Sequence, residues 1–227
     1  MKFILNLIYK YYKKGHSYEK GNFLNRFHRI FFSSKRSIKY FFGFNVYDEL
    51  DKTKGRSKFD LTTILLKTIL NRFLKKSIKN LEILEVGTGY YSLLSIYLEK
   101  KYNHQITATD IDPNAIISSK LNCEKNNVSI ELIASDLFEN INDKKFDIIF
   151  WNLPYYSDVN IYLKPFLNQV SKYLNTNAII FLGYNSTPLK PETIINLTKD
   201  SHGIKYTNTE NFFWNHHKIA VISKINS

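Results

Sequence analysis

The residues best suited to chemistry in this 227-residue sequence are Asn152-Leu153-Pro154-Tyr155, which end the apolar run 146–151. The run predicts a buried strand, and the tetrapeptide predicts a rigid turn. The Asn152 side-chain oxygen and the Leu153 carbonyl can each accept one N–H of a flat NH2 group, while the Tyr155 ring stacks on its plane. The pattern therefore indicates chemistry at an amide or amino nitrogen.

A glycine-containing turn precedes this motif. Residues 81–86 form an apolar, strand-like run, Gly87-Thr88-Gly89 follow, and residues 91–101 have the pattern of a mostly buried helix. The two glycines allow a tight turn and a close approach of the backbone to a ligand, and the start of the helix offers unpaired N–H groups. A strand, a glycine turn and a helix in this order predict a nucleotide pocket.

Two acids follow predicted strands. Asp110 comes directly after the strand predicted over 105–109, and an acid at that distance from the glycine turn can bind both hydroxyls of a ribose. Asp136 follows the strand predicted over 129–134, where it can accept a hydrogen bond from an adenine amino group. Both acids are thus candidates for contacts to a nucleoside.

Taken in order, these patterns resemble the class I S-adenosylmethionine-dependent methyltransferases over roughly residues 80–225. The resemblance implies an α/β fold: a seven-stranded, mainly parallel Rossmann-like sheet with helices on both faces. It implies S-adenosyl-L-methionine as cofactor, no metal, and an acceptor site at Asn152, Leu153, Pro154 and Tyr155, which match the Asn-Pro-Pro-Tyr type motif. The cofactor-binding residues that it implies are Glu85, Gly87, Thr88, Gly89, Asp110, Ile111, Asp136, Leu137 and Asn152.

The sequence departs from the family pattern at two positions. Tyr91 stands where many relatives have a third glycine, which predicts a bulkier helix start and a narrower cofactor pocket. Leu153 replaces the first proline of the acceptor motif, but the role there is that of a backbone carbonyl, which leucine keeps.

Different parts of the sequence resemble different branches of the family. The stretch 136–149 and Leu182-Gly183-Tyr184 resemble the glutamine N5-methyltransferases that modify peptide release factors, and residues 40–47 resemble a segment before their catalytic domain. The motif Asn-Leu-Pro-Tyr instead resembles the corresponding motif of the ribosomal RNA adenine dimethyltransferases. Those enzymes carry an extra domain after the catalytic one, whereas this chain ends after a strand predicted over 218–225, which argues against close kinship with them.

Positive charge is concentrated at the start of the chain. Residues 1–40 hold ten Lys or Arg against the single acid Glu19, so they carry +9 of the formal +12. We expect a basic, aromatic, helical N-terminal segment over 1–58 that contacts substrate or partner, and a catalytic domain over 59–227. Cations lie beside Phe23, Phe27, Phe31 and Phe32 in the sequence, and cations beside rings can track a nucleic-acid backbone. Phe23, Phe27, Ile30 and Phe31, however, fall at helical spacing and suit a core-facing stripe.

Composition restricts the remaining function classes. The single Cys123 excludes an intramolecular disulfide and suits a buried position in a reducing compartment, so we expect a cytoplasmic protein. No run approaches the ~18 apolar residues of a membrane span. The adjacent His216 and His217 begin a predicted strand, where they point to opposite faces and cannot share a metal.

The sequence leaves four functions open. The first is an N-methyltransferase acting on a protein glutamine or similar carboxamide, and the second is an RNA methyltransferase acting on an exocyclic base amine of the adenine N6 type, served by nucleic-acid contact through residues 1–58. The others are a small-molecule N-methyltransferase and a non-catalytic cofactor-binding protein in which Tyr91 blocks the pocket. Oligomeric state is not predicted.

Overall fold

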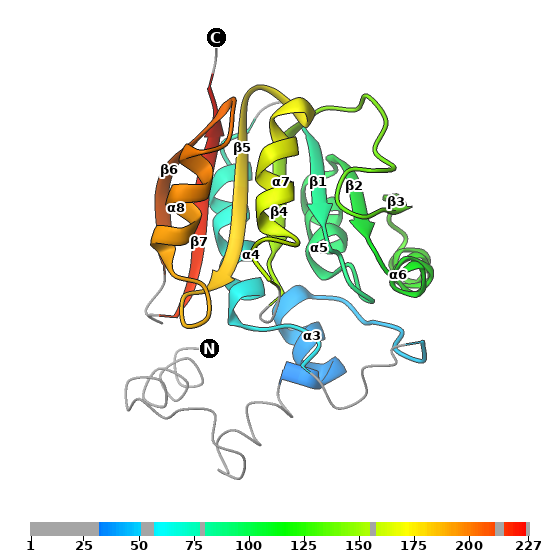
Figure 1. Cartoon of the computed structure of the whole chain (residues 1–227). Coiled ribbons are helices and arrows are strands. Elements are labelled where there is room, and N and C mark those ends of the chain that lie inside the picture. The colour runs from blue at the N-terminus through cyan, green and yellow to red at the C-terminus, as the bar shows by residue number, and fades with distance from the viewer. Residues whose placement is uncertain (1–31, 51–56, 78–79, 155–157, 212–215, 226–227) are drawn as a thin grey trace.

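The computed structural model describes residues 32–50, 57–77, 80–154, 158–211 and 216–225, which form six α-helices, a short 3-10 turn and one seven-stranded sheet (Figure 1). The helices are α3 (Lys35–Phe42), α4 (Leu61–Leu74), α5 (Leu93–Tyr102), α6 (Pro113–Asn126), α7 (Leu163–Val170) and α8 (Pro191–Lys199). The strands are β1 (Glu82–Val86), β2 (Gln105–Asp110), β3 (Glu131–Ala134), β4 (Phe146–Asn152), β5 (Leu174–Asn185), β6 (Ile204–Asn211) and β7 (His217–Lys224).

The strands lie in the order β3-β2-β1-β4-β5-β7-β6, and β7 alone runs against the others. Val86 in β1 is level with Thr109 in β2 and with Trp151 in β4. The carboxyl ends of these three central strands therefore meet at one edge of the sheet. The predicted fold class, a mainly parallel seven-stranded sheet with helices on both faces, is confirmed.

Helices cover both faces of this sheet (Figure 1). The core on one face is shared by residues of α4, α5 and α6, and the core on the other by residues of α7 and α8. Strands buried on both faces read as continuous apolar runs, which is why β1 and β4 were recognisable from sequence. The predicted strands over 81–86, 105–109 and 218–225 correspond to β1, β2 and β7.

The apolar pattern predicts a helix over 159–174 and a buried strand over 177–183, but α7 covers only Leu163–Val170. Residues before Leu163 form turns, because the side chain of Asp158 accepts from Asn160 N and its carbonyl accepts from Ile161 N. Local bonds of this kind compete with helix formation. At the other end the chain tightens into a 3-10 turn at Ser171–Tyr173 and enters β5 at Leu174, earlier than the predicted 177.

Helix α4, which the sequence analysis did not delimit, begins with a capping box. The Asp60 side chain accepts from Thr63 N, and the Thr63 side chain accepts from Asp60 N. The helix packs very closely on β5, since a Cβ placed on Gly183 would lie 2.7 Å from Thr62 Cγ2 and 2.8 Å from Leu66 Cδ1. Only glycine at position 183 allows α4 to approach the sheet in this way.

The described part of the N-terminal segment packs against the helices that cover the sheet. Phe32, Ile38, Phe42, Phe44 and Val46 are buried in the core that α4 and α5 share. Helix α3 lies beside the edge of the sheet at which β1 and β2 end (Figure 1). Phe32, the one described ring of the predicted aromatic run, is buried. The core-facing stripe predicted over Phe23, Phe27, Ile30 and Phe31 lies outside the described residues and stays a prediction.

Cys123 lies in α6 and is buried, as predicted from its apolar setting. Burial raises the pKa of its thiol to about 12, so the thiol stays protonated at neutral pH. Within the described ranges, no helix is both long enough and apolar enough to cross a bilayer.

Replacing Gly183 by Ala should destabilise the protein. The added methyl group would overlap Thr62 and Leu66, and overpacking of this kind costs about 1 to 3 kcal/mol. Urea unfolding measures the change in the free energy of unfolding. Thr176→Ala, at an exposed position of the same strand, is the control and should change stability by less than about 0.5 kcal/mol. Equal stability of the two variants would contradict the close α4 packing.

Candidate active site

The glycine turn after β1 has the backbone that its sequence predicts. Gly87 and Gly89 have φ values of 66° and 67°, in the left-handed region that favours glycine. A Cβ at Gly87 would lie 2.9 Å from Trp151 Nε1, whereas a Cβ at Gly89 would meet nothing within 4 Å. The turn is thus closed against β4 at Gly87 and open at Gly89, and Thr88 N fixes it to β2 by donating to Thr109 O at 2.8 Å.

Asp110 at the end of β2 braces this turn. Its Oδ2 accepts from Gly89 N at 2.8 Å, and its Oδ1 accepts from Asp112 N at 3.0 Å. Burial raises the pKa of Asp110 above its ordinary value, and the hydrogen bonds from backbone N–H groups oppose that rise. Each carboxylate oxygen has a further lone pair, so the group that holds the turn can also accept hydrogen bonds from a ligand.

Glu85 lies in β1, two residues before Gly87, and its buried side chain is surrounded by hydroxyl groups. Its Oε2 accepts from Thr88 Oγ1 at 2.8 Å, from Ser95 Oγ and from Ser95 N at 3.3 Å. Burial raises the pKa of Glu85 from its ordinary 4.5 to about 7, although the hydroxyl groups partly offset that rise. Glu85 therefore ties the glycine turn to the first turn of α5.

The loop after β3 lies beside Asp110. Ser135 N donates to Asp110 O at 2.9 Å, which brings the exposed Asp136 to the same edge as the glycine turn. Leu137 is buried and has a φ of 48°, so the chain turns sharply there. Ile111, next to Asp110, is 59% exposed and offers an apolar surface at the mouth of the site.

Asn152 ends β4 at this edge, and its side-chain NH2 is already bonded. The amide nitrogen donates to Thr63 Oγ1 at 3.1 Å and to Asp60 Oδ1 at 3.3 Å, both at the start of α4. Leu153 N donates to Gly183 O at 2.8 Å. Among the described residues, nothing donates a hydrogen bond to Asn152 Oδ1 or to the Leu153 carbonyl. Two of the three groups expected to hold a flat NH2 are thus available as acceptors, and the third, Tyr155, lies outside the described residues.

Beside Leu153 and Pro154 the surface is hollowed. The hollow has a volume of about 400 Å³, including the solvent to which it opens. Its lining is mostly apolar and comes from the segment after β4 and the end of β5. The residues that line it are Leu153, Pro154, Val159, Leu163, Tyr184, Asn185, Pro188 and Leu189.

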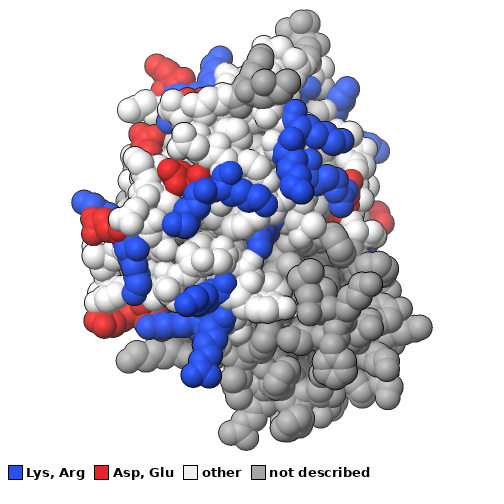
Figure 2. Space-filling view, turned by 180° about the vertical axis from the view of Figure 1, so that it is seen from behind, with Lys and Arg blue, Asp and Glu red and all other residues white. Residues whose placement is uncertain are grey.

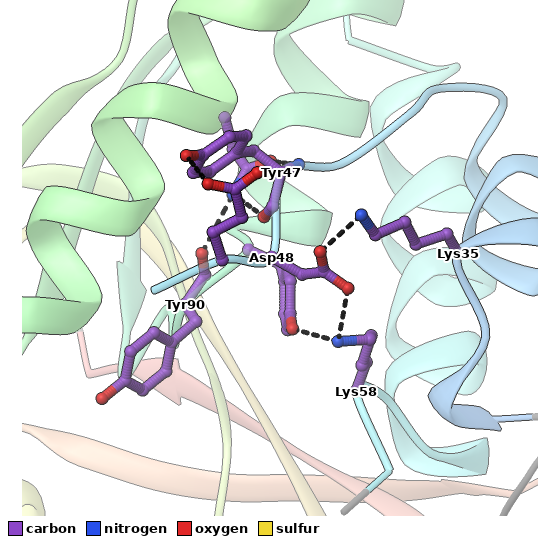
Figure 3. A network of polar contacts seen from close by, with 8 residues as sticks. Lys35, Tyr47, Asp48, Lys58 and Tyr90 are labelled. Atoms are coloured by element: carbon purple, nitrogen blue, oxygen red, sulfur yellow. Dashed lines mark hydrogen bonds and ion pairs between the residues drawn. The ribbon is translucent and has the colours of Figure 1, made fainter. Parts of the chain in front are cut away.

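Tyr91 packs into the core on the α4 and α5 side of the sheet. It is 5% exposed, and its hydroxyl contacts Lys58 Nζ, which also lies 4.6 Å from the centre of its ring. Lys58 in turn pairs with Asp48, which also pairs with Lys35 (Figure 3). The ring that was expected to narrow the pocket is therefore buried beneath the N-terminal segment, while Gly89 remains open.

The carboxamide of Asn122 in α6 joins the N-terminal segment to the glycine turn. Its oxygen accepts from Tyr47 N at 2.6 Å, and its nitrogen donates to the carbonyls of Tyr47 and Tyr90, each at 3.1 Å. Asn122, Asp60 and Thr63 were not predicted from sequence to have a role at this site. The two α4 residues had a recognisable signal, an Asp-x-x-Thr cap before an apolar run, whereas Asn122 had none.

The two adjacent histidines, His216 and His217, have different environments. His217 is buried, its Nδ1 lies 2.7 Å from Thr62 Oγ1, and burial lowers the pKa of its imidazole. His216 is exposed. In the part of the chain that the structure describes, no three His, Cys, Asp or Glu side chains are grouped so that they could hold a metal ion.

A strand, glycine turn and helix beside a strand that ends in Asp, on a sheet with one reversed strand, define a class I methyltransferase. The family model for the methyltransferase small domain matches residues 55–209, and the chain belongs to this family. The chain thus carries a methyltransferase domain of the S-adenosylmethionine-dependent class. The burial of Tyr91 away from the open side of Gly89 does not support a non-catalytic role in which this ring blocks the pocket.

Individual relatives and structures agree with this assignment. A Methanocaldococcus jannaschii protein, provisionally named a protein N5-glutamine methyltransferase, is 41% identical over 92 residues, 40% of this chain and 43% of that protein. A Pyrococcus furiosus methyltransferase structure superposes with a TM-score of 0.68 at 22% identity, covering 89% of this chain and 98% of that one.

A third comparison concerns a complex. A Thermus thermophilus 16S rRNA N2 G1207 methyltransferase, solved with AdoMet and guanosine, superposes with a TM-score of 0.64 at 21% identity, covering 77% of this chain and 45% of that one. The chain spans 58% or less of the length of the first curated relatives it matches.

The buried Glu85 should make stability depend on pH. Between pH 4.5 and 7 the unfolded carboxyl ionises while the folded one stays protonated, so stability falls as pH rises through this window. The total loss is roughly 3 kcal/mol and is complete above pH 7. Glu85→Gln removes this term, so its stability relative to the parent protein should rise across the same window in urea titrations without cofactor.

The control for this experiment is Glu139→Gln, at an exposed position. Thr176→Ala, at another exposed position, is a second control, and its stability relative to the parent should be the same at each pH because it neither adds nor removes an ionisable group. A constant difference for Glu85→Gln as well would show that Glu85 is not desolvated on folding.

Proposed function

We propose that this methyltransferase transfers a methyl group to a planar amide or amino nitrogen, with the glutamine or a similar carboxamide of a protein as acceptor. The observation that carries the proposal is the pair of acceptors at the end of β4. Asn152 Oδ1 and the Leu153 carbonyl receive no hydrogen bond from any described residue, and both stand at the edge where the glycine turn lies. An NH2 group has two N–H bonds to give, one to each of these oxygens.

The residues around the glycine turn fit the cofactor. Asp110 has lone pairs left for the hydroxyl groups of a ribose, and the open space at Gly89 lets a ligand approach the backbone. The exposed Asp136 can accept from an adenine amino group, and Ile111 offers an apolar surface to a flat ring. Glu85, Thr88 and Leu137 are buried, so their part in the proposed cofactor site is to support the glycine turn and the loop after β3. S-adenosylmethionine supplies an electrophilic methyl group on a sulfonium.

Orientation provides most of the acceleration in this proposal. The lone pair of an amide or base amino nitrogen is delocalised, so the nitrogen is a poor nucleophile. Holding it in line with the methyl group removes an entropic barrier worth on the order of 7 to 11 kcal/mol in the best-oriented cases. The two oxygens at Asn152 and Leu153 also stabilise positive charge that develops on the nitrogen. The N–C bond would form as the methyl–sulfur bond breaks, and the nitrogen would release one proton to the solvent that reaches this edge. No histidine or cysteine base takes part.

A carboxamide on a protein is favoured for two reasons. The relative from Methanocaldococcus jannaschii carries the name of a glutamine methyltransferase, although the match covers 43% of it. The apolar hollow beside Leu153 and Pro154 can receive a neighbouring part of a polypeptide acceptor. We also propose a cytoplasmic location, because the free thiol of Cys123 suits a reducing compartment.

An exocyclic base amine of RNA is the second candidate, and the charge distribution favours it. Lys and Arg side chains are spread over the face of the sheet that α4 and α5 cover (Figure 2). Lys75, Lys76 and Lys100 are exposed there, and Phe73 is 37% exposed between the cations of this face. Cations beside an exposed ring suit a phosphate backbone and a stacked base. Residues 1–31, which hold further Lys and Arg residues in the sequence, lie outside the described residues.

One experiment separates these acceptors. The protein is incubated with methyl-labelled S-adenosylmethionine in an extract of the source cell, and the product is treated with protease or with RNase. Loss of the labelled product to protease supports the protein carboxamide, and loss to RNase supports the base amine. Label in a product that resists both would favour a small molecule and overturn the preferred acceptor.

Asn152→Ala should abolish transfer and spare the cofactor. The substitution removes one of the two acceptors of the NH2 group, so we expect the rate of label transfer to fall at least 100-fold, which is about 2.7 kcal/mol. The dissociation constant of S-adenosylmethionine, measured by calorimetry, should change less than threefold. Asn208→Ala on β6, distant from this edge in the sheet order, is the control. Unchanged transfer by Asn152→Ala would refute the mechanism.

Asp110→Asn should instead weaken the cofactor complex. Loss of a charged acceptor for a ribose costs about 1.5 to 3 kcal/mol, or roughly 10-fold to 150-fold in affinity. Asparagine keeps one acceptor oxygen, so it can accept from Gly89 N or from Asp112 N but not from both. Urea unfolding of the variant therefore checks that the fold is retained. Asp143→Asn, at an exposed position, gives the calorimetric baseline. If the two variants bind the cofactor equally well, the ribose does not lie at Asp110.

A further inference from the structure

We propose that Asp60 and Thr63 are positioning residues, which hold the Asn152 carboxamide with its oxygen toward the methyl acceptor. The inference rests on the proposed function, because it concerns how Asn152 comes to present an acceptor and not a donor. An asparagine side chain has similar shapes in its two orientations, so the surroundings must decide which end faces the substrate.

The start of α4 offers Asn152 only acceptors. Thr63 Oγ1 donates its hydrogen to Asp60 Oδ1 at 2.8 Å, so toward Asn152 this hydroxyl can only accept. Asp60 Oδ1 belongs to a carboxylate that already receives Thr63 N at 2.7 Å. The NH2 of Asn152 lies within 3.1 Å of Thr63 Oγ1 and 3.3 Å of Asp60 Oδ1. The reverse orientation would set the amide oxygen against two oxygens.

The acceptors at the start of α4 are held firmly in place. The close contact of Thr62 and Leu66 with Gly183 fixes the distance between α4 and β5, the strand next to β4. The bond between Thr62 Oγ1 and His217 Nδ1 ties the same turn of α4 to β7. The capping box fixes Thr63 relative to Asp60. Asn152 is therefore oriented by groups that belong to the rigid part of the fold.

This arrangement has a consequence for specificity. With its NH2 directed at α4, Asn152 presents an oxygen to the substrate, and so does the Leu153 backbone. Two acceptors select a reacting group that carries two hydrogens, such as a primary amide or an unmodified amino group. They discriminate against an acceptor that lacks N–H groups, since two carbonyl-type oxygens would then face lone pairs without a donor.

Thr63→Val tests the proposal. Valine keeps the shape of threonine and the bond from the backbone N–H to Asp60, but it removes the hydroxyl that accepts from Asn152. We expect the rate of label transfer to the extract fraction that accepts methyl groups to fall about tenfold, with the calorimetric affinity for S-adenosylmethionine unchanged. Thr63→Ser should restore transfer. Thr68→Val is the matched control, because the Thr68 hydroxyl bonds only to Ile64 O within α4.

A double variant distinguishes positioning from general structural damage. If Thr63 acts through Asn152, Thr63→Val combined with Asn152→Ala should transfer no more slowly than Asn152→Ala alone. A further tenfold loss in the double variant, or wild-type transfer by Thr63→Val, would overturn the proposal. Wild-type transfer by Asn152→Ala itself would instead refute the proposed function, so the two failures differ.

A second measurement needs neither an acceptor nor a folded Thr63 variant. In the nuclear magnetic resonance spectrum of the 15N-labelled protein, the side-chain NH2 signal of Asn152 is assigned by its loss in Asn152→Ala. Two bonds to α4 should slow its hydrogen exchange at least tenfold relative to the NH2 of the exposed Asn127. Exchange at the rate of Asn127 would overturn the proposal.

Discussion

The structure depends on the register of three parallel strands. Because β1 is level with both β2 and β4, the residues that follow them emerge at one edge of the sheet. Gly87, Asp110 and Asn152 are far apart in sequence, yet this register alone brings them together. A slip of one residue would move every side chain of a strand to the opposite face, where the packed helices fit side chains of other shapes. The placement of the site is thus set by the same burial that stabilises the sheet.

Helix α4 sets the orientation of the Asn152 side chain, which the strands do not determine. A strand can bring Asn152 to the edge, but it cannot decide which end of a carboxamide faces outward. That choice is made by the Asp60 and Thr63 cap, which reaches Asn152 because Gly183 lets the helix lie against β5. The capping residues of a helix therefore serve a second purpose here, in addition to satisfying its first N–H groups.

Much of the fold was predictable because its signals are local. The apolar runs of β1, β4 and β7, the glycine turn and the Asp cap of α6 all lie in short stretches of sequence. The contacts between distant segments were not predictable. Nothing near Asn122 indicates that it bonds Tyr47 and Tyr90, and nothing near Tyr91 indicates that its ring turns into the core toward Lys58. These features depend on which surfaces the folded chain brings together.

The carboxamide of Asn122 makes the glycine turn and the N-terminal segment thermodynamically linked. One side chain bonds the backbone of Tyr47 and the carbonyl of Tyr90, so the free energies of ordering the two segments are not independent. Such coupling is reciprocal: whatever favours this arrangement of the turn favours this arrangement of the segment to the same degree. An acceptor that docks against residues near Tyr47 and a cofactor that settles on the turn near Tyr90 would then bind with positive cooperativity.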